Sequence, residues 1–310
     1  METSTLHMNA RIALPTLVLA VLTALTMVRP AAAGPWGLPP GQWYANLEGS
    51  TFTANTFHGE GFRADTGLIV EERALRIAVE VGWKKRLTLL FGLPMLSVTR
   101  RDAQIQGTAT GFQDVLVGMR YNLSDGARAA AFELAWSGPS GYNRQLDTLG
   151  IRLGDGLQDL SAQLQLGSAI AGRGFVEGSF GYAYRYLGIA KRDKGPFVPG
   201  DPSPAKYLWS DRLLFSTDLG LWLGPSVLAG GRYRGSMTFS NGALVDKVVV
   251  HLAGPILLYR LDDQLDMFAG SWSTVTAKHA LHYDQVYLGL AFHRTKLNRL
   301  QGFLGGTQAP

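Results

Sequence analysis

Residues 75–95 read LRIAVEVGWKKRLTLLFGLPM, two alternating segments on either side of a basic turn. In the first segment, apolar side chains occupy every second position from Leu75 to Trp83, while Arg76 and Glu80 fall between them. Successive side chains of a β-strand point to opposite faces, so one face is apolar enough for lipid and the other carries charges that lipid excludes. The stretch therefore predicts a β-hairpin that turns at Lys84-Lys85-Arg86 and separates two different surroundings.

The same alternation recurs along the chain and predicts twelve strands between about residues 42 and 293. Short connections at 84–86, 124–127, 171–174, 223–225 and 261–264 alternate with longer ones at 54–72, 99–111, 137–156, 188–210, 240–246 and 275–284. In outer-membrane barrels the short turns are periplasmic and the long loops face outward. The predicted fold is all-β, a closed antiparallel up-and-down transmembrane β-barrel of about 12 strands. A soluble periplasmic β-sandwich, which also has regular short strands, is the alternative.

Residues 1–33 have the pattern of a secretory signal peptide. Arg11 precedes an apolar run from Ile12 to Val28, and Ala31-Ala32-Ala33 offers a small-residue cleavage site. Met1 or Met8 could be the start. We expect the mature domain to comprise residues 34–310, with strands over 42–293 and a tail over 294–310. That part has no apolar run of membrane-spanning length, which excludes a helical membrane protein but allows strands of about ten residues.

Composition excludes several classes of function. Without Arg11, Arg29 and Glu2, the chain retains 27 basic and 23 acidic residues, a net charge of +4 that does not indicate nucleic-acid binding. The absence of cysteine excludes disulfides, thiolate metal sites and a cysteine nucleophile. His279 and His282 are close in sequence, but no carboxylate pattern completes a metal site. We predict no metal and no cofactor.

Four segments resemble the outer-membrane β-barrel family of the MetA-pathway of phenol degradation. They are residues 75–94, 111–122 (GFQDVLVGMRYN), 153–159 (LGDGLQD) and 174–177 (GFVE), within a likeness that covers roughly 42–293. The resemblance implies location in the outer membrane of a Gram-negative cell and passive uptake of small hydrophobic or aromatic compounds, with no catalytic residues. One departure is that a tail follows the last strand, which ends near Phe292.

The expected partners follow from this architecture. They are outer-membrane lipid and lipopolysaccharide, whose phosphates the basic loop residues can contact, small hydrophobic or aromatic solutes, and the barrel-assembly machinery during biogenesis.

The polar face of the strands supplies the candidate pore-lining residues. They are Arg76, Glu80, Asp114, Arg120, Glu133, Asp159, Glu177, Arg185, Arg212, Asp218, Arg232, Arg234 and His251. Mixed charges of this kind set the selectivity of a pore, or alternatively form ion pairs that fill a narrow barrel. Residues 34–41 are too few to form a plug domain. Pro94 and Pro255 interrupt strand patterns and are candidate kinks through which solutes could leave laterally, but ordinary prolines at strand ends are the favoured interpretation.

Two other functions compete with transport. One is a structural or surface-interaction barrel that conducts nothing. The other is an outer-membrane lipase, which needs a serine and a histidine side by side. Phe239-Ser240-Asn241-Gly242 resembles part of such a site, but no histidine stands two residues before the serine. We therefore expect no enzymatic activity.

Overall fold

The computed structural model describes residues 37–58, 63–101, 106–124, 127–140, 158–170, 173–186, 211–239, 248–278 and 280–294. The predicted signal peptide, residues 295–310 of the predicted tail, His279 and Ser240 lie outside these ranges. Among the described residues, no helix is long and apolar enough to cross a membrane.

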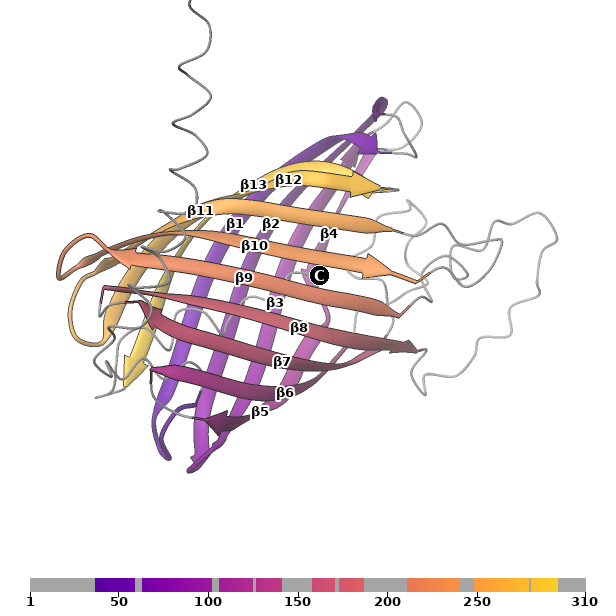
Figure 1. Ribbon diagram of the computed structural model, residues 1–310. Coiled ribbons are helices and arrows are strands. Elements are labelled where there is room, and N and C mark those ends of the chain that lie inside the picture. Colours follow the sequence, from indigo (N-terminus) through magenta and orange to yellow (C-terminus); the bar gives the residue numbers. More distant parts are fainter. Residues whose placement is uncertain are drawn as a thin grey trace, which may run out of the picture.

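The described chain is a single antiparallel sheet closed into a barrel of tilted strands (Figure 1). The strands are β1 (Trp43–His58), β2 (Arg63–Lys84), β3 (Leu87–Arg101), β4 (Gln106–Phe112), β5 (Val115–Ser124), β6 (Arg128–Gly138), β7 (Gln158–Ile170), β8 (Gly174–Tyr186), β9 (Arg212–Trp222), β10 (Val227–Thr238), β11 (Val249–Arg260), β12 (Leu265–Lys278) and β13 (Ala280–Arg294). β13 pairs with β1 from Trp43↔Arg294 to His58↔Ala280, and this pairing closes the barrel. The prediction of a closed antiparallel barrel is confirmed.

Strands β4 and β5 share one place in the wall, so the ring has twelve positions. Both pair with β3, β4 along Met95–Arg101 and β5 along Leu87–Gly92. The interruption at Gln113 and Asp114 lies opposite Pro94, whose carbonyl accepts a hydrogen bond from the Gln113 amide at 2.9 Å. Proline has no amide hydrogen to donate to a ladder, which accounts for a break in the partner strand at this position.

Pro255 marks a second gap in the ladders. The β11–β12 pairing stops at Ala253↔Ser273 and resumes at Ile256↔Gly270. Within the gap the backbones come so close that a Cβ on Gly254 would overlap the Ser271 carbonyl. Both prolines therefore lie inside strands rather than at strand ends.

Adding a methyl group at Gly254 is expected to weaken the barrel. Gly254→Ala forces the Ser271 backbone to move, and overpacking of this kind costs about 1–3 kcal/mol of unfolding free energy. The matched control is Gly231→Ala, because Gly231 faces Pro255 across the β10–β11 ladder and a Cβ there meets nothing within 4 Å. Urea unfolding of the detergent-solubilised barrel measures both. Equal midpoints for the two variants would contradict the expectation.

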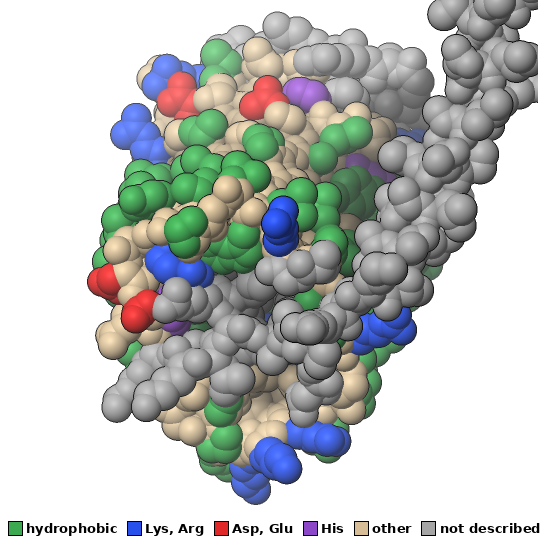
Figure 2. Space-filling model, turned by 60° about the vertical axis from the view of Figure 1, so that its left-hand side comes forward, with side chains coloured by type: hydrophobic (Ala, Val, Ile, Leu, Met, Phe, Trp, Pro, Cys, Tyr) green, Lys and Arg blue, Asp and Glu red, His purple; other side chains and the backbone are tan. Residues whose placement is uncertain are grey.

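The outer wall is apolar along most of its height. Side chains that alternate with buried ones are exposed on many strands, among them Leu75, Phe91, Met119, Phe132, Leu166, Phe180, Leu257 and Val286. Figure 2 shows part of this hydrophobic surface. A β-sandwich would bury such side chains in its core, so this surface fits lipid.

Three connections that the sequence predicts as long or intermediate loops consist largely of strand. β1 and β2 extend into 54–72, β3 and β4 into 99–111, and β12 and β13 into 275–284. On the β3–β4 hairpin the outward side chains are hydroxylic: Thr99 and Thr108 hydrogen-bond at 2.9 Å, and Thr110 donates to Ser97 at 3.0 Å. A strand with polar residues on its outer face lacks the apolar alternation of a lipid-facing segment, which is why the pattern ends before the strand does.

Candidate functional site: the barrel lumen

The lumen has two chemically different walls. Strands β1–β9 bury mainly polar side chains, including Asn46, Glu48, Glu80, Thr88, Arg120, Glu133, Gln163, Glu177 and Asp218. Strands β10–β13 bury more of the large apolar and aromatic ones, including Leu228, Leu252, Ile256, Leu258, Phe268, Trp272 and Tyr287, together with the polar Arg232, Asp266, Thr274, Gln285 and His293. An aromatic solute could therefore contact rings on one side and hydrogen-bonding groups on the other.

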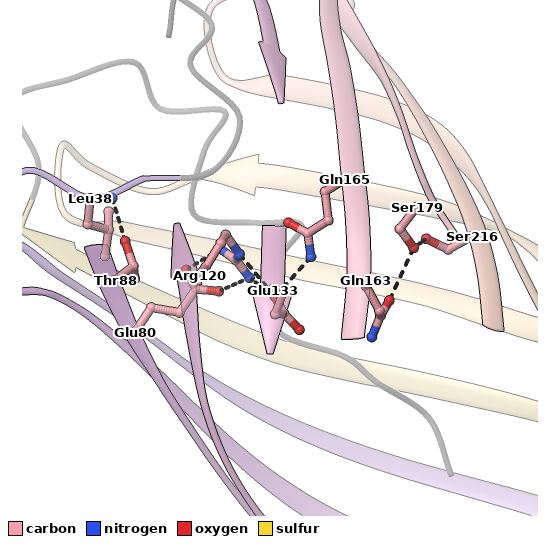
Figure 3. Close-up of polar contacts among 9 residues, drawn as sticks. All are labelled: Leu38, Glu80, Thr88, Arg120, Glu133, Gln163, Gln165, Ser179 and Ser216. Atoms are coloured by element: carbon pink, nitrogen blue, oxygen red, sulfur yellow. Dashed lines mark hydrogen bonds and ion pairs between the residues drawn. The ribbon is translucent and has the colours of Figure 1, made fainter. Parts of the chain in front are cut away.

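Arg120 joins three strands in a deeply buried ion cluster. Its guanidinium donates to Glu80 at 2.9 Å and to Glu133 at 2.9 and 3.0 Å, and only 1% of its surface is exposed (Figure 3). Gln165 donates to the same Glu133 oxygen at 2.9 Å. Because β3 separates Glu80 from Arg120, these contacts reach across the inner wall between strands that are not neighbours. They brace the wall and fill the lumen at this level.

A second cluster lies on β1 and β2. Arg76 pairs with Glu48 at 3.1 Å and with Glu72 at 3.4 Å, and it donates to Ser50 in a contact of 2.6 Å. Gln285 on β13 also donates to Ser50, at 2.9 Å. The cluster thus connects β2 with β1 and β13, the two strands whose pairing closes the barrel.

On β7–β9, Asp159 accepts from Arg185 at 2.9 Å and also pairs with Arg212. Both arginines belong to the candidate set, and the structure brings them to one carboxylate. Asp211 lies beside this unit, because one of its carboxylate oxygens accepts a hydrogen bond from the Arg185 amide at 3.0 Å.

Asp218 on β9 holds two arginines of β10. Arg234 binds both of its oxygens at 2.9 Å, and Arg232 approaches at 3.4 Å. The two guanidinium carbons lie 5.1 Å and 5.7 Å from the Trp272 ring centroid, within the range of cation–π attraction. This is where the polar wall meets the aromatic wall.

Glu177 is a lumen carboxylate with spare acceptor capacity. It lies directly across from Asp218 in the β8–β9 ladder. It is 9% exposed, and its Oε2 has no hydrogen-bond partner among the described residues. A buried acceptor without a partner is costly, so a hydroxyl or amine donor of a solute would be well placed here.

The segment before β1 enters one end of the lumen. We call it the short-turn end, because β2 turns into β3 there at residues 84–86 and the described parts of the other short connections lie at the same end. The Leu38 amide donates to Thr88 Oγ1 at 3.0 Å (Figure 3), and Leu38 is 4% exposed. The Gly41 amide donates to the Gly82 carbonyl at 2.9 Å, and Gly41 adopts φ +77°, which favours glycine in this turn. A Cβ on Gly82 would overlap the Leu38 and Pro39 carbonyls. This short segment therefore occupies the lumen although it is too small to be a plug domain.

Leu38 completes a core inside the barrel. It belongs to one buried cluster with wall residues from β1, β6, β8 and β10–β13, among them Tyr44, Ala131, Phe175, Leu258 and Phe268. Apolar side chains therefore contribute to filling the short-turn end of the lumen, beside ion pairs such as Arg260–Asp266.

His251 is not on the lumen side, contrary to the predicted set. On β11 the buried positions are Leu252, Ile256 and Leu258, so His251 points outward. Gly235 on β10 is the register partner of both His251 and Phe215. The His251 ring contacts the Tyr233 hydroxyl, and its centroid lies 5.3 Å from the centroid of the Phe215 ring. The prediction assumed that the polar face is the inner one, and β11 reverses that rule because its apolar face lines the aromatic wall.

The other predicted residues lie as follows. Asp114 is in the interruption between β4 and β5 and not on a strand. The remaining eleven face the lumen, within or beside the clusters above. Whether they line a conducting pore stays a prediction.

Several lumen residues escaped the sequence analysis. Trp272 and Tyr287 have ring centroids 6.3 Å apart. The alternation around Tyr287 places it on the same face as Gln285, whereas the strand of Trp272 shows no clear alternation. Asp266 pairs with His293 at 3.3 Å and with Arg260 at 3.6 Å near the short-turn end. The alternation on β13 places His293 on the face opposite Phe292, a signal that could have revealed it.

Comparison with solved structures identifies the architecture. An outer-membrane channel from Pseudomonas putida F1 is similar to this chain with a TM-score of 0.65, at 13% identity over 86% of this chain and 100% of that one. The β domain of the Bordetella autotransporter BrkA (TM-score 0.49, 14% identity, 82% and 100% coverage) and the translocator domain of NalP from Neisseria meningitidis (0.48, 10%, 92% and 96%) are more distant and carry no argument.

The first similarity shows that the chain has the fold of an outer-membrane β-barrel. At this level of identity it shows nothing finer. No family description and no characterised protein matches the sequence. Membership of the phenol-degradation family is therefore not confirmed and stays a prediction.

Proposed function

We propose that this chain is an outer-membrane channel for the passive passage of small hydrophobic or aromatic compounds, as expected for the phenol-degradation barrel family. The observation that carries the proposal is the divided lumen, in which Phe268, Trp272 and Tyr287 face a wall of hydrogen-bonding groups. Such a lining suits ring compounds with one polar substituent, since ligand sites combine apolar surface with a few placed polar groups.

The proposed route begins at the long-loop end, which would face the outside, and runs towards the short-turn end in the periplasm. Solutes would pass the arginine pair on Asp159 and then the level of Arg232 and Trp272. A lateral exit into the bilayer at Pro94 or Pro255 would require the strands to separate, because the backbones are in close contact at both positions. Contacts with lipopolysaccharide and with the assembly machinery remain expectations of the same proposal.

A second candidate function, a barrel that does not transport, has an observation in its favour. Arg120 and Asp218 are each 1% exposed, so the lumen is packed at their level in this conformation. Passage of a solute requires these side chains or the Leu38 segment to move, whereas a purely structural barrel requires no such movement.

Uptake into proteoliposomes separates the two functions. If the chain is a channel, vesicles that contain it should take up a small aromatic alcohol faster than vesicles with heat-unfolded protein, and should exclude a sugar of similar mass. The sugar control is needed because a leaky membrane admits both solutes. A barrel that is folded by gel mobility but leaves aromatic uptake unchanged would overturn the transport proposal.

A further inference from the structure

Five cations gather on one side of the short-turn end. Lys84, Lys85 and Arg86 form the β2–β3 turn, and Arg128 and Arg173 stand at the next two turns; all five are exposed. We call this group the basic arc. Figure 2 shows Lys and Arg side chains at the lower end of the view.

The three turns of the basic arc are neighbours in the barrel. The Asn122 amide donates to the Arg86 carbonyl at 2.9 Å, which links the first turn to the end of β5. The Ala169 amide donates to the Ala127 carbonyl at 2.9 Å, which links the second turn to β7. The cations therefore follow consecutive turns around about half of the rim.

The charge of the arc is one-sided. Its described turn residues contain no acid, while Asp125, in the middle turn, lies outside the described residues. On the opposite half, the turn after β11 presents Asp262 and Asp263, both exposed, and Arg260 points inward with its guanidinium 4.5 Å from the Trp222 ring. The rim is thus basic over β2–β8 and acidic at β11–β12.

Apolar side chains lie directly beside the basic arc on the outer wall. Trp83 is 57% exposed, and the Lys84 ammonium lies 5.0 Å from its ring centroid. Tyr121, Leu123 and Leu166 are also exposed on the adjoining strand ends. Amphipathic aromatic rings and long cationic side chains at one level are the arrangement by which proteins anchor at the headgroup region of a bilayer.

We propose that the basic arc binds the phosphate headgroups of anionic phospholipids in the leaflet that surrounds the short-turn end. The inference rests on the proposed insertion of the barrel into a membrane and not on solute transport. Cations near a membrane surface attract anionic lipid, and the attraction is screened by salt. The binding would fix the depth and tilt of the barrel, with β2–β8 held against the headgroups.

Lipid retention tests the proposal. The folded barrel is released from micelles that contain phosphatidylglycerol or phosphatidylcholine with the same acyl chains, and bound lipid is counted by native mass spectrometry. The wild type should retain phosphatidylglycerol preferentially, and Lys85→Gln with Arg86→Gln should lower that affinity about tenfold to thirtyfold. Raising the salt concentration should also lower the affinity for phosphatidylglycerol.

The matched control removes two exposed cations from the other end of β2 and β3, Arg73→Gln with Arg101→Gln. Equal losses in both double variants, or equal retention of the two lipids by the wild type, would overturn the proposal. Displacement of the lipid by glycerol phosphate at the same concentration would also overturn it, because the arc would then be a site for soluble phosphates. Gel mobility confirms that each variant is folded, and aromatic uptake reports on transport separately.

Discussion

Leu38→Asp is expected to raise the uptake of small solutes by at least about tenfold. The substitution removes a buried apolar side chain worth about 1.5–3 kcal/mol and places a charge among apolar residues, so the segment should leave the lumen. A shift of about 3 kcal/mol changes the ratio of docked to released segment about a hundredfold. Flux of a small aromatic alcohol into proteoliposomes measures the effect.

The matched control for this prediction is Pro40→Asp, which adds the same charge to an exposed position of the same segment. Release can be read independently, because the chain contains no cysteine. A cysteine introduced at Asn122, which Gly37 covers, should react with a water-soluble maleimide only in the Leu38→Asp background. Release without increased uptake would contradict the prediction and would place the closing layer at Arg120 and Arg232.

Arg120→Met is expected to destabilise the barrel by about 3–5 kcal/mol. Removing one partner of a buried ion cluster leaves the others charged and without compensation. Here two carboxylates, Glu80 and Glu133, would face each other with their shared cation gone. The midpoint of urea unfolding, followed by the heat-dependent shift in gel mobility, reports the loss.

Neutralising the whole cluster should recover most of that stability. In Glu80→Gln, Arg120→Met, Glu133→Gln, no charge is buried alone, and such replacements are often nearly neutral. Arg76→Met is the matched single control, because the Arg76 side chain is 17% exposed and can lose its partners at lower cost. A triple variant no more stable than Arg120→Met would show that geometry, and not charge balance, makes the cluster important.

Much of the fold was predictable from local pattern. The alternation in 75–95 places Leu75 and Glu80 on opposite faces, as the structure does, because a lipid-facing strand requires this period. The cross-strand pair Arg120 and Glu133 follows from two strands joined by a short turn. The turn itself fixes the register, so neighbours within a hairpin are within the reach of sequence reasoning.

The candidate site was less predictable, because the rule that separates lumen from lipid changes around the barrel. Where the lumen wall is polar, polarity assigns the faces correctly. Where the lumen wall is aromatic, as on β11, both faces of the strand are apolar. The polar residue His251 then predicts the wrong face as the inner one. The inward position of Trp272 could not be predicted for the same reason. Its own strand carries no signal that apolar side chains of other strands pack around it inside the barrel.

The sequence therefore carries the strand period, the short turns and the antiparallel pairing within each hairpin, since these depend on residues that are close along the chain. The tertiary structure decided the content of the lumen. Arg120 meets Glu80 across an intervening strand, and Leu38 shares a buried cluster with residues up to 253 positions away, at Ala291. Contacts between distant segments depend on how the barrel closes, and local alternation holds no record of that closure.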